Sequence, residues 1–584
     1  MSKKIETVSK SKKDFLLDPH LADYERTYLD FDWKEALKEI EFFEDGKLNA
    51  AYVALDKHAK TWRKNKVAIY WDHIDGMKEK FTYNELIKES NKFANVLKKL
   101  GIKKGDRVFI FLPRYPQVHI CFFGILKVGA IASTVFAAFG PEALKDRLEN
   151  SGAKMIITTP ELKKRIDPVK DSLPNLAVIM EVRGYEKEKS ETYPVETVNY
   201  EEEMKTASPE FEMERMDPDD PMFMLYTSGT TGKPKGVVHR HGGIVQQHLT
   251  AKWVLDLHDE DVYWCTADHG WVTGISYAIL GSCSNGASMV IHEGRFEPEK
   301  WYKVIENYGV TIWYTAPTAI RMLMKAGDEL PKSYNMKSLR LLYSVGEPLN
   351  PEAIRWGLKA FGLPFHDTWW QTETGSMLIV NYPVMPIKLG SMGRPFPGVV
   401  AGIVDDNGNE LPPHMEGNLA IRPGWPSMLK EIWNNEPKYK EYFKHGWYIP
   451  GDRAMKDEEG YFWFIGRADD VIKTSGERVG PFEVESVLIE HPAIAEAGVI
   501  GKPDALRGEI IKAFLTLNPG HKGTPQLEEE IKKFVKTRLA GHAFPREIEF
   551  VDKLPKTRSG KIMRRLLKAK EMGLEIGDTS TLED

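Results

Sequence analysis

The sequence contains little cysteine, three residues in a chain of 584. Cys121, Cys265 and Cys283 lie far apart and form no CxxC pair, which argues against both a disulfide framework and a zinc knuckle. The amino-terminal stretch MSKKIETVSKSKKDF lacks the uninterrupted apolar segment of a secretory signal peptide. We therefore expect a protein of a reducing compartment, most simply the cytoplasm.

The chain also lacks an excess of positive charge. Lysine and arginine total 80 against 85 aspartate and glutamate residues, so no global positive field is present to hold nucleic acid or anionic lipid. One stretch could be mistaken for a membrane span, residues 118–136, but Lys127, Gly124 and Gly129 interrupt it. We expect neither nucleic acid nor a membrane as a partner.

What the sequence does contain is the composition of a large globular protein. Hydrophobic residues make up 42% and charged residues 28%, and the length requires at least two cores. Short β-rich runs are present at 108–112, 155–158 and 177–180. Between them, residues 118–136 are expected to form a helix followed by a strand, and residues 141–150 a helix. This order predicts an α/β class, with parallel sheets packed by helices in a large part of several subdomains.

The pattern changes near residue 467. Residues 451–476 indicate a turn, a hairpin around Glu459-Gly460 and a polar connection. The segment that follows contains strands at 498–500 and 512–517 and a helix at 527–539, enough for a small mobile α+β domain. The charged segment 181–216 is expected to be a surface excursion. The predicted division is an amino-terminal segment of the large domain (1–80), the large domain (81–466), a hinge (467–470) and a small carboxy-terminal domain (471–584).

A candidate phosphate-binding loop occupies residues 226–236, YTSGTTGKPKG. Glycines let backbone amides approach phosphate oxygens, hydroxyls donate hydrogen bonds and lysines supply positive charge. The spacing GxxxxGK[ST] of a Walker A loop is absent, and a flexible surface turn is the alternative. The residues of interest are Thr227, Ser228, Gly229, Thr230, Thr231, Gly232, Lys233 and Lys235.

The loop resembles the signature loop of the adenylate-forming superfamily, which comprises acyl-CoA synthetases, luciferases and nonribosomal peptide adenylation domains. Four further motifs follow in the order of that superfamily: Gly346-Glu347-Pro348, residues 367–375 (DTWWQTETG), Gly451-Asp452 with Gly466-Arg467, and residues 555–561 (PKTRSGK). Within it, residues 264–274 (WCTADHGWVTG), 343–351 (YSVGEPLNP) and 554–565 (LPKTRSGKIMRR) resemble the AMP-forming acetate:CoA ligases. The resemblance implies a small domain that rotates between two half-reactions, adenylation of a carboxylate by ATP and transfer of the acyl group to CoA.

The resemblance also implies roles in nucleotide binding. The 227–236 loop would hold the β- and γ-phosphates, Thr372 would donate to the α-phosphate, and Glu373 would be the protein ligand of Mg²⁺. Asp452 would accept the ribose hydroxyls, with Arg467 on the ribose and Arg478 on the phosphate. The adenine slot would be formed by Gly346, Glu347, Pro348, Asp367, Thr368 and Trp369.

Lys561 of the PKTRSGK motif is implied to be the catalytic lysine, reaching the substrate carboxylate and the α-phosphate. From Lys556 to Lys570 there are seven basic residues and no acidic one, which is also typical of a solvated amphipathic helix or of a nucleic-acid-binding tail. In the relatives that it resembles, acyltransferases modify this motif, so a lysine acyltransferase and a deacylase acting on Lys561 are possible partners.

For the acyl group, the resemblance implies that Trp370 closes a small pocket completed by Val272, Thr273 and Val345. A core aromatic residue is the alternative for Trp370. For CoA, rotation near Asp469 would bring in the Ser475-Gly476 segment. Candidate partners of the CoA 3′-phosphate are Arg147, Lys536 and Arg538.

The sequence therefore predicts a ligase that uses ATP, acetate and CoA with Mg²⁺. Two alternatives stay open: a ligase for another short acid such as propionate, and an adenylate-binding regulatory protein without turnover. His239, His241 and His269 carry no carboxylate at ligand spacing, and no metal site is expected there. Cys265 and Cys283 lie in apolar stretches and are expected to pack in the core.

Overall fold

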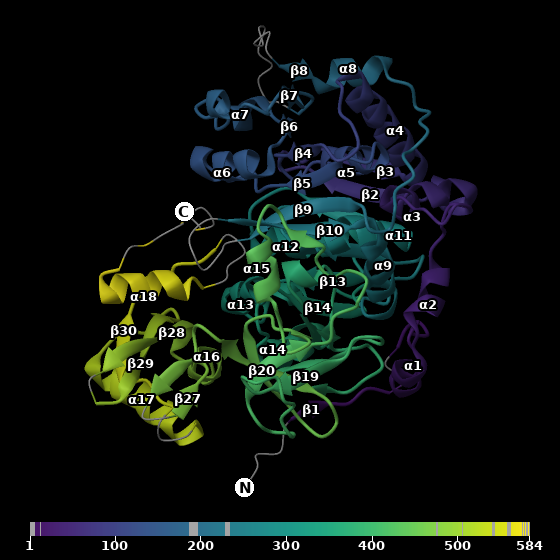
Figure 1. Ribbon diagram of the computed structural model, residues 1–584. Coiled ribbons are helices and arrows are strands. Elements are labelled where there is room, and N and C mark those ends of the chain that lie inside the picture. The colour runs from purple at the N-terminus through teal and green to yellow at the C-terminus, as the bar shows by residue number, and fades with distance from the viewer. Residues whose placement is uncertain are drawn as a thin grey trace.

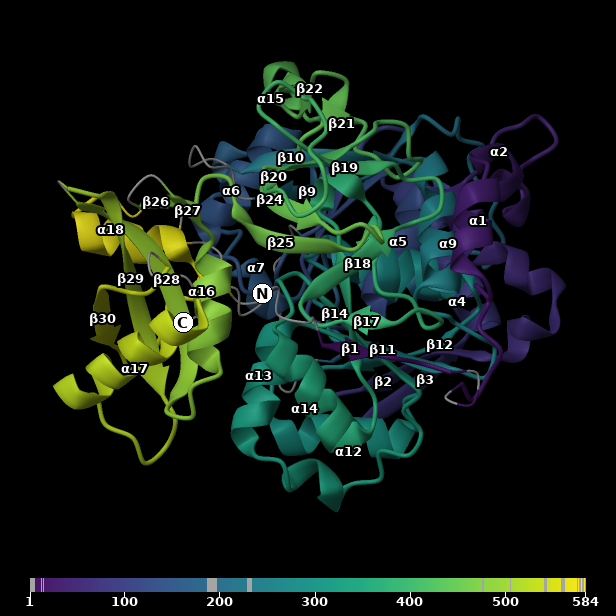
Figure 2. The same cartoon turned by 90° about the horizontal axis from the view of Figure 1, so that it is seen from below.

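The computed structural model describes residues 6–11, 13, 15–185, 197–227, 234–474, 477–504, 506–539, 543–557, 562–574, 576, 579 and 582. In this part of the chain two large sheets and their helices form one body, and a smaller sheet forms a second body beside it (Figures 1 and 2). The predicted α/β class with a small α+β domain is confirmed. No described helix is both long and apolar enough to cross a membrane.

The first large sheet has the strand order β21-β10-β9-β5-β4-β6-β7-β8, and its last strand β8 is Val198–Asn199. Its centre is parallel and confirms the predicted alternation of strands and helices. These elements are β4 (Arg107–Ile110), α5 (Gln117–Lys127), β5 (Ile131–Thr134), α6 (Pro141–Ser151), β6 (Met155–Thr158) and β7 (Val178–Glu181). At the other edge, β9 (Pro221–Thr227) and β10 (Lys235–Arg240) pair antiparallel, and β21 (Glu431–Ile432) follows them.

The second large sheet contains a run of parallel strands that leads toward the site. In spatial order they are β2 (Val67–Asp72), β12 (Ser288–His292), β11 (Val262–Cys265), β13 (Ile312–Thr315), β14 (Leu341–Val345) and β15 (Phe365–Trp369). The sheet continues antiparallel through β16 (Ile379–Val380), β18 (Ser391–Pro395), β25 (Phe462–Arg467), β24 (Asp452–Lys456) and β20 (Gly417–Ile421). Since the parallel strands end at one edge, the loops after β13, β14 and β15 meet there.

The two-residue period of the strands explains how this sheet is covered. In β13, Ile312 and Tyr314 belong to the main hydrophobic cluster and Trp313 to another cluster. The second cluster includes residues of α12 (Pro298–Tyr308), α13 (Pro317–Ala326) and α14 (Pro351–Phe361), which Figure 2 shows grouped together. The main cluster includes residues of α4 (Tyr83–Lys99), α5 and α9 (Ile244–Trp253) and joins the two large sheets. Both faces are therefore buried, as parallel sheets require.

Two features of the large part were not predicted, one at the start of the described chain and one near residue 200. Strand β1 (Thr7–Val8) pairs antiparallel with β17 (Ile387–Lys388), so the start of the described chain lies against the large part.

The expectation of a surface excursion over 181–216 is wrong for the described residues near its middle: α8 (Tyr200–Thr206) buries Tyr200 and Met204 in the main cluster. An amphipathic turn inside an acidic segment gave too weak a periodic signal.

The second body begins after β25 and has its own core. Its sheet consists of β26 (Ile472–Thr474), β27 (Glu477–Val479), β28 (Ile494–Asp504), β29 (Gly508–Leu517) and β30 (Glu547–Phe550). Helices α16 (Pro481–Ile489), α17 (Pro525–Arg538) and α18 (Arg564–Met572) accompany it. The predicted strands and helix of this region are confirmed. A hydrogen bond of 2.8 Å from Asn350 Nδ2 to Ser486 Oγ links this body to the large one.

Candidate active site

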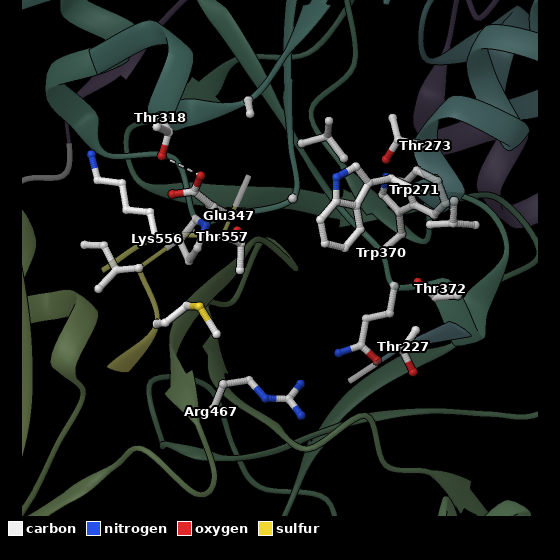
Figure 3. Close-up of a pocket in the computed structure, with 18 of the residues that line it drawn as sticks. Thr227, Trp271, Thr273, Thr318, Glu347, Trp370, Thr372, Arg467, Lys556 and Thr557 are labelled. Carbon is white, nitrogen blue, oxygen red and sulfur yellow. Dashed lines mark hydrogen bonds between the residues drawn. The ribbon is translucent and has the colours of Figure 1, made fainter. Parts of the chain in front are cut away.

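A cleft of about 2540 Å³ lies where the carboxyl ends of the parallel strands face the small domain (Figure 3). The large part contributes the ends of β13, β14 and β15, and the small domain contributes Lys556, Thr557 and the start of α18. Most of the predicted site residues that the structure describes line this cleft. They are Thr227, Lys235, Val272, Thr273, Val345, Gly346, Glu347, Pro348, Asp367, Thr368, Trp369, Trp370, Thr372, Glu373, Asp452, Arg467, Asp469 and Arg147.

The loop after β14 is held by a fixed carboxylate. Gly346 has a φ of 93°, a left-handed conformation that glycine adopts without strain, and it turns the chain at the strand end. Glu347 then accepts hydrogen bonds from Thr318 Oγ1 at 2.7 Å and from Arg321 Nη2 at 2.8 Å. The Glu347 side chain is thereby tied to α13, and the loop has one defined position in the wall of the cleft.

Asp452 is the most constrained carboxylate of the cleft. It begins β24, directly opposite Arg467 on β25, and Arg467 Nη1 donates to its Oδ1 at 2.6 Å. Its Oδ2 accepts from Trp369 Nε1 at 2.9 Å and from Gln371 Nε2 at 3.0 Å. A carboxylate offers about four acceptor sites, so roughly one stays available for a ligand hydroxyl. Accepting two hydroxyls requires that one of these donors move away.

Glu373 forms a second charged group with Lys235 and Tyr442. Lys235 Nζ lies 2.9 Å from Glu373 Oε1, and Tyr442 donates to the same oxygen at 2.7 Å. Burial by itself would raise the pKa of Glu373, but the charge and hydrogen bond of Lys235 outweigh it and the pKa is lowered. The ionised carboxylate suits Mg²⁺, which takes oxygen ligands, and the described contacts leave Oε2 available.

Trp370 forms an apolar wall next to these charged groups. Its side chain is 8% exposed, and the rings of Trp370 and Tyr277 meet edge to face at 5.0 Å. Val272 and Thr273, at the start of α10 (Val272–Ile275), and Val345 line the same cleft. Figure 3 shows Trp271 and Thr273 beside Trp370. All four predicted acyl-pocket residues therefore line the same cleft.

Sequence reasoning missed three of the lining residues that matter here. Trp271, Gln371 and Tyr442 all line the cleft. Trp271 and Gln371 lie inside motifs that were already recognised, so their positions gave a usable signal. Tyr442 lies outside every motif, and its contacts with Glu373 and Lys235 identify it.

Several predicted residues lie outside the described part of the chain. These are Ser228, Gly229, Thr230, Thr231, Gly232, Lys233, Ser475, Gly476 and Lys561. Arg478 belongs to strand β27. On either side of Lys561 in the sequence, Lys556, Thr557, Ile562 and Met563 line the cleft.

The three candidate CoA residues are not gathered in this structure. Arg147 is 2% exposed, its guanidinium lies over the Phe139 ring at 4.2 Å, and it lines the cleft. Lys536 and Arg538 lie on α17 and are absent from the described lining; Arg538 pairs with Glu490 at 3.0 Å. A common phosphate site for all three would need a different position of the small domain.

The surroundings of the histidines and cysteines are typical of residues with a structural role. The side chain of His239 contacts the carbonyl oxygens of Thr372 at 2.8 Å and Ser427 at 3.1 Å, which fixes the loop that carries Glu373. Cys121 and Cys283 are buried, and Cys265 is half-buried. Among the described residues His20, Asp256 and His258 are grouped closely enough for a metal ion, but Arg340 already pairs with Asp256 at 2.9 Å.

Asp367 makes the stability of the protein depend on pH. Burial raises the pKa of its carboxyl to about 7, although hydrogen bonds from the amides of Thr368 and Leu349 oppose the shift. The unfolded carboxyl ionises near pH 4, so between about pH 4 and pH 7 the folded state binds more protons and stability falls as pH rises. We expect Asp367→Asn to raise the free energy of unfolding by about 2–4 kcal/mol at pH 8 and by less at pH 5. Denaturant unfolding without nucleotide at both values tests this, and an equal gain at both would contradict it.

The sequence matches two protein-family models and is similar to known proteins. Residues 55–433 match the model of the AMP-binding enzymes, and residues 483–561 match the model of the AMP-binding enzyme C-terminal domain. The chain is 59% identical to the acetyl-coenzyme A synthetase of Bacillus subtilis (strain 168), over 97% of this chain and 98% of the relative.

Two solved structures are similar throughout. The Brucella canis acyl-CoA synthetase superposes with a TM-score of 0.74 at 36% identity, covering 94% of this chain and 99% of that one. The anthranilate CoA ligase AuaEII, solved in complex with anthranoyl-AMP, superposes with a TM-score of 0.83 at 30% identity, covering 90% of this chain and 98% of that one.

Proposed function

The chain belongs to the AMP-binding enzymes, and from this premise we propose that it is an acid–thiol ligase that activates acetate with ATP and transfers the acetyl group to CoA. The products are acetyl-CoA, AMP and pyrophosphate. The observation that carries the proposal is that one cleft gathers described residues from each of the ordered motifs, with charged groups beside a small apolar wall.

In the first half-reaction a carboxylate oxygen of acetate attacks the α-phosphorus of ATP and pyrophosphate leaves. Two anions must approach each other, so charge neutralisation is the main catalytic requirement. We propose that Lys235 and the 228–233 segment bind the β- and γ-phosphates and that Thr372 donates to the α-phosphate. Lys561 would supply the cation between the carboxylate and the α-phosphate. In the second half-reaction the CoA sulfur attacks the acyl carbon and AMP leaves with the oxygen that came from acetate.

Nucleotide recognition is assigned to the groups around Asp452. The adenine would lie against Gly346, Glu347, Pro348 and the residues from Asp367 to Trp369, with the ribose at Asp452 and Arg467 and the phosphate near Arg478. Magnesium, held in part by Glu373, would neutralise charge on the phosphates. The lowered pKa of Glu373 supports that role, because it keeps the carboxylate ionised.

Replacing Asp452 by asparagine tests the ribose assignment. Asp452→Asn removes one acceptor oxygen and the charge that pairs with Arg467, and we expect the KM for ATP to rise about 10- to 100-fold, as for the loss of a hydrogen bond to a charged group. The measurement is the initial rate against ATP concentration at saturating acetate and CoA.

Asp457→Asn is the matched control for this experiment. Asp457 is a buried carboxylate just after β24, it pairs with Lys388 at 2.5 Å, and it is not part of the described cleft lining. Equal KM values for ATP in both variants and the parent would remove Asp452 from the ribose site.

We propose domain limits of 1–80, 81–466, 467–470 and 471–584, with rotation about Asp469 between the half-reactions. Asp469 and Asp470 lie in the turn after β25, between the two bodies, which suits a hinge. Rotation would bring the Ser475-Gly476 segment to the site of thioester formation. Arg147, Lys536 and Arg538 are proposed for the CoA 3′-phosphate, because rotation can move α17 relative to Arg147.

Two further parts of the proposal concern the cell: regulation by acylation and location. Acylation of Lys561 would remove its charge and stop adenylation, so a lysine acyltransferase and a deacylase are proposed regulators. Intact-mass measurement of protein from its native host tests this. A cytoplasmic location is supported by the free cysteines of the described chain.

An acid series tests the proposed function. The protein is given ATP, Mg²⁺, CoA and acetate, propionate or butyrate, and AMP and pyrophosphate are both measured. We expect equal amounts of the two products, with acetate preferred over propionate by roughly 10- to 200-fold, as for a hydrophobic pocket that discriminates one methylene. A preference for propionate would favour the alternative ligase, and formation of ADP or a lack of turnover would refute the proposal.

A further inference from the structure

The indole of Trp370 is held from two sides by residues behind the cleft wall. Its Nε1 donates to the hydroxyl of Tyr314 at 3.2 Å. Tyr314 lies on β13, two strands away from β15, and its side chain is fully buried. The ring of Tyr277 forms T-shaped pairs with those of Trp370 and Tyr314, at centroid distances of 5.0 Å and 5.9 Å. Tyr314 is not among the described residues that line the cleft, and of the residues that do, its hydroxyl contacts Trp370 and Thr368.

The number of protons on each group determines which group donates in each of these hydrogen bonds. The indole nitrogen can only donate, so Tyr314 accepts from Trp370. Thr368 Oγ1 donates to the carbonyl oxygen of Ser344 at 2.7 Å, so its single proton is used there. At the 2.8 Å contact between Tyr314 and Thr368, the tyrosine must therefore donate. One chain of hydrogen bonds runs from Trp370 through Tyr314 and Thr368 to the backbone of β14.

Tyr277 is fixed as firmly as Tyr314. Its hydroxyl lies 2.8 Å from Thr250 Oγ1 and accepts from the amide of Met377 at 2.8 Å. Its ring therefore packs against the indole from a fixed position, while Tyr314 holds the indole nitrogen. The indole is therefore restrained both by a hydrogen bond at Nε1 and by ring packing.

We propose that Tyr314 is a positioning residue that sets the upper limit of acyl-chain length by holding Trp370 across the end of the acyl pocket. The inference rests on the proposed function, in which Trp370 closes that pocket. Without the Tyr314 hydroxyl, the indole N–H has no acceptor at this buried position, and an unpaired buried donor favours reorientation of the ring. The pocket then has no rigid end.

Tyr314→Phe tests the proposal with one matched control. The kcat/KM values for acetate, propionate and butyrate are measured at saturating ATP and CoA. We expect the butyrate-to-acetate ratio to rise about tenfold, the equivalent of one buried hydrogen bond. Tyr343→Phe removes the hydroxyl of the adjacent buried tyrosine on β14, which donates to the Val254 carbonyl, and the ratio should stay at the parental value.

A double-mutant cycle shows whether Tyr314 acts through Trp370. In a Trp370→Gly background, Tyr314→Phe should leave the acid preference unchanged, because the group that it positions is gone. The proposal is overturned if the two substitutions change the ratio independently, or if Tyr343→Phe changes it as much as Tyr314→Phe. If Trp370→Gly alone does not change the preference, the acyl-pocket assignment of the proposed function fails. If Trp370→Gly changes it and Tyr314→Phe does not, only the inference about Tyr314 fails.

Discussion

Lys561→Ala is expected to abolish formation of the acetyl-adenylate, with a loss of about 10²–10³-fold or more, comparable to removal of one preorganised group that stabilises a transition-state charge. The physical reason is that the acetate carboxylate and the α-phosphate repel each other until a cation lies between them. Two assays separate the half-reactions: pyrophosphate release from ATP and acetate, and acetyl-CoA formation from preformed acetyl-AMP and CoA. The second rate should stay close to that of the parent.

Lys570→Ala is a suitable control for this prediction. Lys570 is an exposed lysine in the last turn of α18, within the same basic segment, and it is absent from the described cleft lining. Its loss should leave both half-reactions unchanged. Equal losses of the two half-reactions in Lys561→Ala would show that the lysine is needed for the fold or for both steps, and the catalytic assignment would be wrong.

Trp370→Gly is expected to move the acid preference from acetate toward medium-length acids. Removing the indole opens the end of the pocket, where Val272, Thr273 and Val345 then form the remaining walls. Each added methylene gains about 1–3 kcal/mol in a hydrophobic pocket that admits it, so the butyrate-to-acetate ratio of kcat/KM should rise by about 10²-fold or more. The ratio is measured with the same acid series, with pyrophosphate release as the signal.

A graded substitution separates pocket size from loss of folding. Trp370→Phe keeps an aromatic ring but shortens it, and we expect an intermediate preference with propionate improved before butyrate. Thermal unfolding of each variant checks that the protein is folded. A folded Trp370→Gly variant that still prefers acetate by the parental factor would place the end of the acyl pocket elsewhere.

The sequence allowed the α/β core to be predicted where the strands are buried on both faces. Residues 155–158 are apolar except for Thr158, and all four are buried because β6 packs against hydrophobic clusters on both faces; such runs stand out from amphipathic helices. The spacing of apolar residues along one segment does not show which other segments it packs against. The burial of Tyr200 and Met204 against the main core was therefore missed.

Some residues of the candidate site could be proposed from the sequence and others could not, for physical reasons. The resemblance of the motifs to those of the adenylate-forming superfamily was enough to propose Asp452, Glu373 and Trp370 as site residues. Contacts between segments far apart in sequence carry no such signal, and the hydrogen bond of Tyr314 with Trp370 arises only from the order of the strands.

The CoA residues illustrate the same limit. Arg147 and Lys536 are both basic residues on helices, and sequence gives no way to tell them apart. The structure shows Arg147 buried at the cleft and Lys536 over the Phe544 ring in the small domain. Their relation to each other depends on the relative position of the two bodies, which is a tertiary property.

The most direct test of the account follows the oxygen of acetate. The enzyme is given acetate with both carboxylate oxygens replaced by ¹⁸O, together with ATP, Mg²⁺ and CoA, and the AMP formed is analysed by mass spectrometry. If the carboxylate attacks the α-phosphorus, each AMP gains one ¹⁸O and unlabelled pyrophosphate is released. Unlabelled AMP, or ADP with the label in inorganic phosphate, would contradict the acetyl-adenylate on which every site assignment depends.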